Sequence, residues 1–303
     1  MLLGHREILK DLENLAAKGS LGQSYLFFGP SMVGKRTAAL AFARFLEKGT
    51  WEAVHEGEIL QDAKVIDLAS MREWEADTKD SIGIGAAREA QHFLWQRPAV
   101  SSRRTLIIDD AEMLTTEAQN ALLKVTEEPP ASSLLIFITS DPEAILPTIL
   151  SRVQKIYFGP IKEAEIGNWI LDIGKKKLDE KKAMDVAKKS LGKPGLAWRL
   201  LFDEELQERL ARAENFLKLA GSPSTTLGAR REFIKDLIEP DDFRLRQFLA
   251  AVALTLAWFT SAGALGKPSA KRVMALWHKT LALQDAATHF GLNPRLQLEN
   301  LLM

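Results

Sequence analysis

The chain has 303 residues, enough for about two or three domains of ordinary size, and 46% of its residues are hydrophobic, as in globular proteins. Its 40 Lys and Arg residues balance 40 Asp and Glu residues, which excludes a nucleic-acid binder that relies on bulk positive charge. It contains no cysteine, which excludes a disulfide scaffold, a thiolate zinc site, an iron–sulfur cluster and a cysteine nucleophile.

Charges at Arg6, Glu7, Lys10 and Asp11 interrupt any apolar export signal near the N-terminus, so we expect a cytoplasmic protein. The uncharged run 248–265 reaches the lower length limit of a membrane-spanning helix. It is rich in alanine and contains hydroxyl side chains and a glycine. These features favour a buried helix of an all-helical domain.

Short apolar runs alternate with helical patterns over the first 160 residues. The apolar runs predict strands at 24–28, 65–68, 106–108, 134–139 and 155–158. Helical patterns occupy 35–47, 86–95 and 115–127, with Ser81 as a candidate N-cap for the second of them. This alternation predicts an α/β domain with a parallel sheet that is covered by helices on both faces.

Strand patterns stop after Gly159 and Pro160, and the rest of the chain has helical patterns. We therefore predict an α/β domain over 1–160, a small helical domain over 161–203 and an all-α domain over 204–303.

The segment Gly29–Lys35 (GPSMVGK) follows a predicted strand and opens a predicted helix, as a P-loop does. In such a loop, backbone N–H groups hold phosphate oxygens and Lys35 reaches the terminal phosphates, so Gly29, Gly34 and Lys35 are candidate nucleotide-binding residues. The next position normally carries a Ser or Thr that helps to hold Mg²⁺, but here it is Arg36. Thr37 follows about 100° further round the helix and cannot simply replace it. A loop retained only as a packed strand–helix turn remains an alternative.

The segment 104–112 (RTLIIDDAE) resembles the second nucleotide-binding motif, because it carries carboxylates to the end of a buried strand. Asp109 is placed to hold Mg²⁺ through water. Asp110 takes the position that orients the attacking water and is one methylene shorter than the usual Glu. A shift of roughly 1 Å there can cost about 100-fold in rate. Without the P-loop, an exposed acidic strand end would explain both residues equally well.

Two later segments carry further candidates. The strand at 134–139 should lie beside the P-loop strand, so that Thr139 or Ser140 could sense a terminal phosphate, although a turn or capping role explains these residues equally well. Ser151 and Arg152 follow the turn after that strand. An arginine in this position is more often a solvent-exposed side chain without a specific role.

Together these residues resemble the AAA+ clamp-loader subunits of DNA replication. The resemblance is carried by DAEMLTTEAQNALLKVTEEPPASSLLIFITSDPEAILPTILSR, which ends at Arg152, and by AAREAQHFLWQRP at 86–98. The last residues, 293–303, are similar to the closing helix of the delta-prime branch of that family, and so is the loop ending in Gly34-Lys35-Arg36. The resemblance covers most of 1–160, is patchy in 161–203, and rests mainly on the last helix beyond that.

The resemblance implies a P-loop AAA+ base domain (1–160), a helical lid (161–203) and a helical collar (204–303) that holds a five-subunit ring. It implies gamma/tau and delta subunits as partners, with the sliding clamp and primed DNA reached through the assembled complex and no membrane involved. Ser151 and Arg152 match the family's Ser-Arg pair, which projects into the ATP site of the neighbouring subunit. Arg152 is thereby implied to be an arginine finger that acts in trans.

The sequence departs from the family pattern at three places. The family often has a four-cysteine zinc module, but residues 48–64 carry only His55 as a candidate ligand, so no zinc is expected. Val153 replaces the cysteine that follows the Ser-Arg pair. Leu196 stands where motor subunits carry a nucleotide-sensing arginine, and Arg199 lies nearly a turn later.

Arg36, Asp110 and Leu196 are three departures within one ATP site, and they predict a delta-prime-like stator with a degraded ATP site of its own and no ATPase activity alone. ATP or ADP with Mg²⁺ would be bound weakly or not at all. The alternative is an active AAA+ ATPase, either a gamma/tau-like motor or another AAA+ machine, which Lys35 and Asp109 support. A plain DNA-binding module is disfavoured by the zero net charge.

Overall fold

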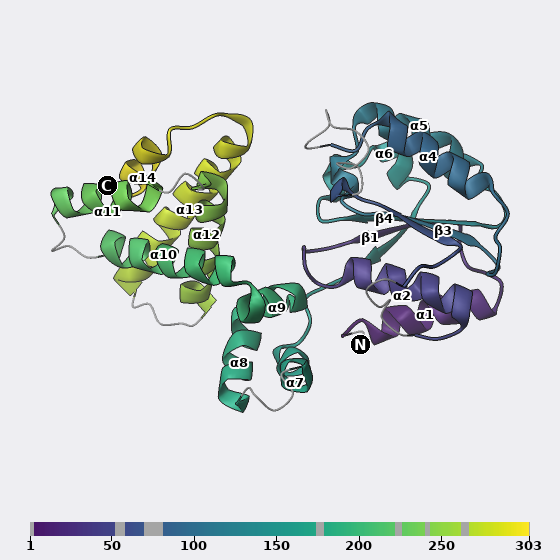
Figure 1. Cartoon of the computed structure of the whole chain (residues 1–303), viewed down its shortest axis with the longest axis horizontal. Coiled ribbons are helices and arrows are strands. Elements are labelled where there is room, and N and C mark those ends of the chain that lie inside the picture. Colours follow the sequence, from purple (N-terminus) through teal and green to yellow (C-terminus); the bar gives the residue numbers. More distant parts are fainter. Residues whose placement is uncertain are drawn as a thin grey trace. The chain divides into compact units, whose positions relative to one another are not determined.

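The computed structural model describes residues 3–51, 58–69, 81–173, 179–221, 226–239, 243–261 and 267–302. The chain divides into two compact units, Met1–Trp198 and Arg199–Met303 (Figure 1). The division falls within helix α9 (Pro194–Phe202).

The first unit is built on a five-stranded parallel sheet with the strand order β2-β3-β4-β1-β5. The strands are β1 (Ser24–Phe28), β2 (Ala63–Ile66), β3 (Arg104–Ile108), β4 (Ser133–Thr139) and β5 (Gln154–Tyr157). All five predicted strands are present, and the predicted pairing of the P-loop strand with 134–139 is confirmed as β1–β4. The α/β class predicted from the alternation of strands and helices is therefore correct.

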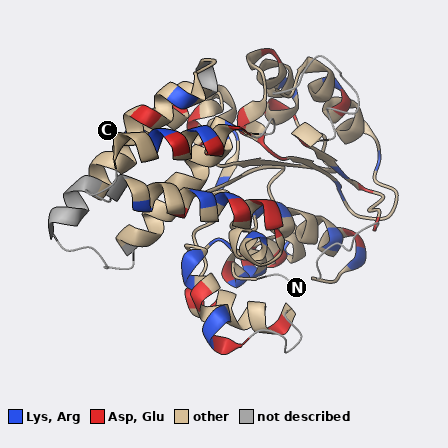
Figure 2. Ribbon diagram, turned by 60° about the vertical axis from the view of Figure 1, so that its left-hand side comes forward, with Lys and Arg blue, Asp and Glu red and all other residues tan. Residues whose placement is uncertain are grey.

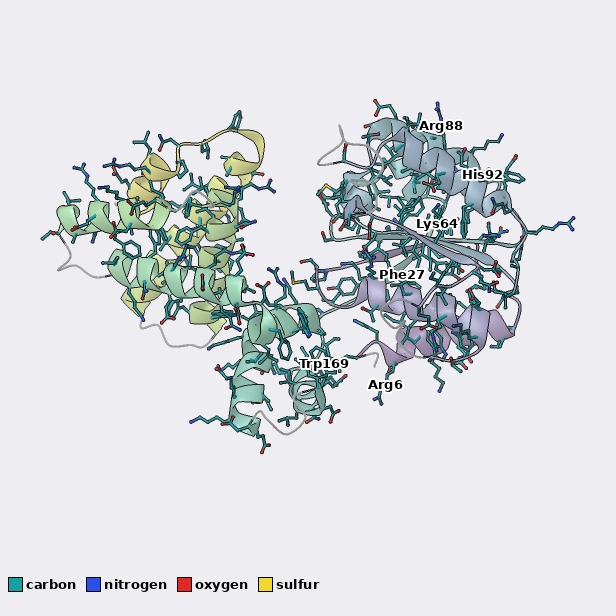
Figure 3. All side chains as sticks on the ribbon, in the orientation of Figure 1. Arg6, Phe27, Lys64, Arg88, His92 and Trp169 are labelled. Carbon is teal, nitrogen blue, oxygen red and sulfur yellow. The ribbon has the colours of Figure 1, made fainter. Side chains whose placement is uncertain are left out.

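Helices cover both faces of this sheet (Figure 1). Helices α1 (Arg6–Ala17) and α2 (Lys35–Lys48) lie on one face, and α4 (Ile84–Trp95), α5 (Thr116–Glu127) and α6 (Pro147–Leu150) lie on the other. Successive residues of β1 point to opposite faces, so that Leu26 joins the core under α4 and α5 while Phe27 joins the core under α1 and α2 (Figure 3).

The predicted N-cap of α4 is wrong. The helix begins after Gly83, whose backbone is extended, and no side chain caps it. By contrast, Thr115 caps α5 by accepting a hydrogen bond of 3.2 Å from the N–H of Ala118. Short 3₁₀ turns follow β3 and β4 at Ala111–Met113 and Pro142–Ala144.

Three helices complete the part of the chain between the sheet and the unit division. They are α7 (Glu163–Ile173), α8 (Glu180–Lys189) and the start of α9. Helices α7 and α8 pack on each other, and α7 carries Trp169 (Figure 3).

The described residues of the second unit form helices and the turns that join them, with no strand among them. Its helices are α10 (Glu204–Gly221), α11 (Leu227–Ile238), α12 (Leu245–Ser261), α13 (Lys267–His289) and α14 (Pro294–Leu302). Helix α12 packs on α10 and α13, and its Phe248 meets Phe216 edge to face at 5.5 Å. The described part of the uncharged run, 248–261, contributes Phe248 and other buried residues to the core of this unit, and residues 262–265 lie outside the described residues. No helix among the described residues has the length and apolar character needed to cross a membrane.

Candidate functional site

The loop between β1 and α2 has the backbone that its glycines predict. Gly29 has a φ of 138° and Gly34 a φ of 103°, both in the region that favours glycine. At Gly29 a side chain is also excluded by space, because a Cβ atom there would lie 2.2 Å from the carbonyl oxygen of Phe158. Met32 adopts a positive φ of 64° without being glycine. The loop therefore turns sharply from the strand into the first turn of α2, as a phosphate-binding loop must.

Lys35 is buried at the start of α2, with 7% of its surface exposed. Its Nζ donates hydrogen bonds of 2.6 Å to the carbonyl of Gly29 and 2.7 Å to the carbonyl of Pro30. Burial lowers the pKa of Lys35, while the negative charges of Glu112 and Asp109 oppose that shift. The predicted phosphate-binding cation is thus held against the loop that would carry the phosphates.

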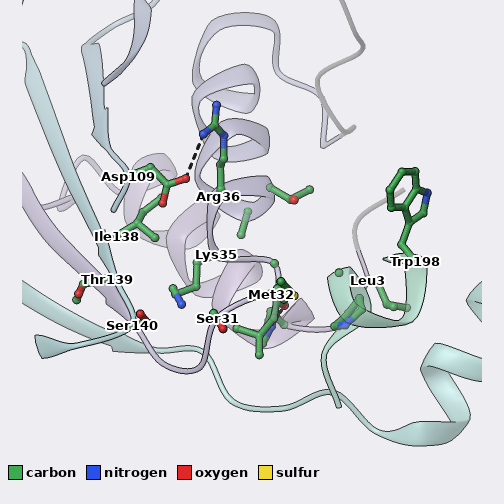
Figure 4. Close-up of a pocket in the computed structure, with 18 of the residues that line it drawn as sticks. Leu3, Ser31, Met32, Lys35, Arg36, Asp109, Ile138, Thr139, Ser140 and Trp198 are labelled. Carbon is green, nitrogen blue, oxygen red and sulfur yellow. Dashed lines mark hydrogen bonds and ion pairs between the residues drawn. The ribbon is translucent and has the colours of Figure 1, made fainter. Parts of the chain in front are cut away.

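Arg36 forms two ion pairs with carboxylates. Its Nη1 lies 2.5 Å from Oδ2 of Asp67. The same atom lies 3.2 Å from Oδ2 of Asp109 (Figure 4). Partial burial alone would lower the pKa of Arg36, but the hydrogen bond and charge of Asp67, together with Asp109, outweigh it and raise that pKa. The residue that interrupts the motif is therefore engaged with the carboxylate that would hold Mg²⁺.

Strand register brings the two acidic partners of Arg36 together. In the parallel β2–β3 pair, Ile66 is aligned with Ile108, so the next residues, Asp67 and Asp109, emerge side by side at the carboxyl edge of the sheet. The N–H of Asp109 also donates to the carbonyl of Ile66 at 2.9 Å. Asp67 falls inside the strand predicted at 65–68 and was therefore not identified as a site residue, whereas in the structure it follows β2 as Asp109 follows β3.

Asp110 and Glu112 lie beside Asp109 in the lining of one cavity, and we call these three residues the acidic edge. Asp110 has a φ of 51°, and partial burial together with the charges of Asp109 and Glu112 raises its pKa. Glu112 accepts hydrogen bonds from the hydroxyl of Ser140 at 2.6 Å and from its N–H at 3.2 Å. Burial alone would raise the pKa of Glu112, but these hydrogen bonds outweigh it and lower that pKa. Glu112 belongs to the segment 104–112, but no role was predicted for it, because its contact with Ser140 joins two segments that are distant in the chain.

Thr139 is buried at the end of β4, and its hydroxyl is engaged in a turn. The hydroxyl donates to the carbonyl of Asp141 at 3.0 Å and accepts from the N–H of Asp141 at 2.9 Å. Both Thr139 and Ser140 lie in the lining of the same cavity as Lys35. The structure thus shows the turn role for Thr139 while keeping it beside the loop.

A cavity of about 520 Å³ joins these groups (Figure 4). One side is polar and is formed by the loop, Arg36, Thr37 and the acidic edge. Leu3, His5, Trp169 and Trp198 lie along the remainder of its lining. The size and the combination of apolar and charged walls suit a small polar ligand with an aromatic part.

The start of α9 touches the phosphate loop directly. The N–H of Gly195 donates to the carbonyl of Met32 at 3.1 Å, and a Cβ atom on Gly195 would lie 3.0 Å from that of Met32. The next residue, Leu196, is buried, while Arg199 pairs with Asp203 at 2.8 Å. The position compared with a nucleotide-sensing arginine therefore contributes to packing.

Ser151 and Arg152 lie after α6, outside the lining of the cavity. Nη1 of Arg152 donates to the carbonyl of Thr148 at 2.6 Å, and Nη2 pairs with Oε1 of Glu127 at 2.8 Å. The hydroxyl of Ser151 also donates to the carbonyl of Thr148, at 3.0 Å. The side chain of Arg152 is 36% exposed, so its guanidinium lies at the surface of the first unit.

The loop and the metal position differ in how well they fit their usual ligands. The turn, the glycines and Lys35 fit a phosphate group. The metal position does not fit Mg²⁺, because the hydroxyl ligand is replaced by Arg36 and Asp109 already receives the cationic guanidinium. Within the described ranges no set of three His, Asp or Glu side chains could hold a metal ion, and residues 52–57, with His55, lie outside those ranges.

Positive and negative side chains are interspersed along the helices (Figure 2). This distribution agrees with the balanced composition and offers no support for the alternative of a plain DNA-binding module.

Comparison with known proteins adds a family match to this geometry. A family model described as "DNA polymerase III, delta subunit" matches residues 4–162. The chain is 32% identical over 162 residues to DNA polymerase III subunit gamma/tau of Mycobacterium tuberculosis, covering 52% of this chain and 28% of that protein. It is 30% identical over 169 residues to DNA polymerase III subunit delta' of Bacillus subtilis, covering 54% and 50% respectively. The chain thus spans no more than half of the length of these two curated relatives.

A solved structure shares the fold over nearly the whole chain. It is a DNA polymerase III gamma subunit-related protein from Thermotoga maritima, with a TM-score of 0.54, 21% identity and 97% of each chain covered. At that identity the likeness concerns the fold alone.

Proposed function

This chain belongs to the DNA polymerase III delta-subunit family of clamp-loader subunits, and we propose that it acts there as a delta-prime-like stator. In this role it is a ring member that does not hydrolyse ATP at its own site and that supplies Arg152 to the ATP site of a neighbour. The observation that carries the proposal is the engagement of Asp109 by Arg36.

The degraded site follows from electrostatics. Hydrolysis in P-loop proteins relies on a metal ion that neutralises the developing charge on the phosphates. Arg36 removes one ligand of that ion and places a fixed positive charge on another, Asp109. Asp110 and Leu196 add a shortened carboxylate and a missing sensor cation. These are separate departures within one site, and each lowers the expected turnover.

The trans finger is supported by position and chemistry. Arg152 lies at the surface after a short helix, and its partners among the described residues are a carbonyl, a hydroxyl and one partly exposed carboxylate. A guanidinium presents several N–H donors in a planar fork, which suits the oxygens of a transferring phosphoryl group. Exposed ion pairs are worth about 0.2–1 kcal/mol, so breaking the contact of Arg152 with Glu127 requires little free energy.

The proposal extends to domains and partners. Residues 1–160 are the AAA+ base, 161–203 the lid and 204–303 the collar that holds a heteropentamer. The partners are gamma/tau and delta subunits in the cytoplasm, with the sliding clamp and primed DNA engaged by the whole complex. The relatives named gamma/tau and delta' support these partners.

The test uses a reconstituted complex with gamma/tau, delta, sliding clamp and primed DNA. We expect Arg152→Ala to lower ATP turnover by about 10³-fold at the site that receives the finger, as in related systems, whereas Lys35→Ala leaves turnover nearly unchanged. Single-turnover assays with each motor site inactivated in turn would resolve that one site. Arg152→Lys should behave like Arg152→Ala, because it keeps the charge and loses the fork.

Two controls separate a finger from a structural effect. Arg97→Ala removes another exposed arginine, outside the cavity lining, and should leave turnover unchanged. Assembly of the complex, followed by gel filtration, should be unaltered in every variant. Full turnover with Arg152→Ala would overturn the finger.

The active ATPase remains the second candidate, because Lys35 is buried and correctly placed beside the loop. Turnover by the isolated chain that Lys35→Ala abolishes would establish it and overturn the stator.

A further inference from the structure

We propose that the cavity binds a nucleoside diphosphate without a divalent cation, with the Arg36 guanidinium replacing the charge of the metal. This inference rests on the proposed function, because it concerns the same site in a subunit that does not hydrolyse ATP. It goes further because it assigns Arg36 a role in binding the ligand, whereas the proposed function treats Arg36 only as the loss of a metal ligand.

The phosphate end of the cavity is complete except for the metal. The loop conformation is fixed by Gly29 and Gly34, and Lys35 is buried beside it. The ammonium of Lys35 already lies 2.6–2.7 Å from two loop carbonyls, where it would also reach a phosphate oxygen in the loop. These groups recognise phosphate with or without Mg²⁺.

The other end of the cavity suits the nucleoside. Leu3, His5, Trp169 and Trp198 contribute apolar or aromatic surface, which can pack against a base. His5 is fixed by a hydrogen bond of 3.1 Å between its Nε2 and the carbonyl of Val33. Its ring also packs edge to face on that of Phe158, with 4.7 Å between the ring centroids. The cavity of about 520 Å³ lies within the usual range for small-molecule sites.

Arg36 performs the electrostatic task of the metal within the protein itself. Asp67 and Asp109 meet at the carboxyl edge of β2 and β3, and two adjacent carboxylates would repel an anionic ligand. The guanidinium contacts both, at 2.5 and 3.2 Å, and cancels part of their charge. Since 47% of its side chain remains exposed, the guanidinium also retains surface for other contacts.

The remaining charges favour a diphosphate over a triphosphate. Asp110 and Glu112 are not paired with Arg36, and both act on Lys35 at the polar end of the cavity. Partial burial, together with the negative charges of Asp109 and Glu112, raises the pKa of Asp110 at this end. A third phosphate would add negative charge at this end without a metal ion to neutralise it.

The test is isothermal titration calorimetry of the full chain with ADP, in Mg²⁺ and in EDTA. We expect the two dissociation constants to agree within about twofold, and ATP in EDTA to bind roughly tenfold more weakly than ADP. ADP binding that EDTA abolishes, the absence of ADP binding in both buffers, or tighter binding of ATP in EDTA would each overturn the proposal.

Arg36→Thr restores the hydroxyl residue that usually helps to hold Mg²⁺. We expect it to weaken ADP binding in EDTA by about tenfold or more and to make binding depend on Mg²⁺. The matched control is Lys48→Thr, which removes an exposed cation from the same helix and should leave ADP binding unchanged. Thermal melts of both variants would show that each is folded. Metal-independent binding that persists in Arg36→Thr would overturn the role of Arg36.

Failure of this inference and failure of the stator are distinguishable. If the chain binds no ADP but Arg152→Ala still lowers turnover in the complex, the stator stands and this inference is lost. If ADP binds without metal but Arg152→Ala has no effect, the reverse holds.

Discussion

Glu127 holds the guanidinium of Arg152 at 2.8 Å, between Oε1 and Nη2, at the end of α5. The same guanidinium is anchored through Nη1 to the carbonyl of Thr148. Both terminal nitrogens of the candidate finger are thus engaged within its own subunit. In a ring, the contact with Glu127 would compete with contact to a phosphate of the neighbouring site.

This competition predicts the effect of Glu127→Gln. Loss of the carboxylate charge should release Arg152 and raise turnover at the neighbouring site by up to about fivefold, because an exposed ion pair is worth at most about 1 kcal/mol. The measurement is ATP turnover in the reconstituted complex, with Glu127→Gln/Arg152→Ala as the control that should cancel the gain. A fall in turnover would show that Glu127 positions the arginine instead of restraining it.

Two glycines of the phosphate loop should differ in their tolerance of alanine. At Gly29 a Cβ atom meets the backbone oxygen of Phe158 at 2.2 Å and φ is 138°, so Gly29→Ala should lower the free energy of unfolding by about 3 kcal/mol or more. At Gly34 φ is 103°, but a Cβ atom there would meet no neighbouring atom within 4 Å. Gly34→Ala should therefore lower the free energy of unfolding by only about 1–2 kcal/mol. Urea denaturation of both variants measures the difference. Equal losses would show that backbone strain alone sets the cost.

Glu112 should contribute a pH-dependent part of the stability. Its folded-state pKa lies below the ordinary value of 4.5, because hydrogen bonds from Ser140 outweigh the effect of burial. The stabilisation from ionised Glu112 is therefore present above that value and is lost as the pH falls through the folded-state pKa. Glu112→Gln should show a shallower loss of unfolding free energy under acidic conditions than the wild-type chain, as measured by denaturant titrations at several pH values.

Ser140→Ala provides the matched variant, because it removes the hydroxyl donor and leaves the carboxylate in place. It should also reduce the acid-dependent loss. An unchanged pH dependence in both variants would mean that Glu112 does not carry this contribution.

Much of the fold could be predicted from local patterns. The strand at Ser24–Phe28 is an apolar run bounded by turn residues, and its predicted limits are those of β1. The ends of other elements were harder to predict, because they depend on pairing with neighbouring strands. Strand β2 begins at Ala63 rather than Val65, since Ala63 already pairs with Thr105 of β3. Helix α4 begins after Gly83, whose extended backbone ends the preceding segment without a capping side chain.

The candidate site could be predicted only in part, for a related reason. Lys35 and Asp109 follow from spacing within their own segments. The contact of Arg36 with Asp67 depends on the register between β2 and β3 and on the reach of a side chain from α2 across both. Sequence spacing carries no direct information on such a contact, so Arg36 was predicted as the loss of a metal ligand and not as an ion-pair partner.

The ion pair of Arg36 with Asp67 also implies a dependence between two positions of the chain. Arg36 is compatible with this edge of the sheet because Asp67 and Asp109 both accept from it. A relative that keeps the arginine should keep the acid at the position of Asp67 as well, because the carboxylate accepts from the guanidinium. Substitutions at these two positions should therefore arise together during divergence, even though they are far apart in the chain.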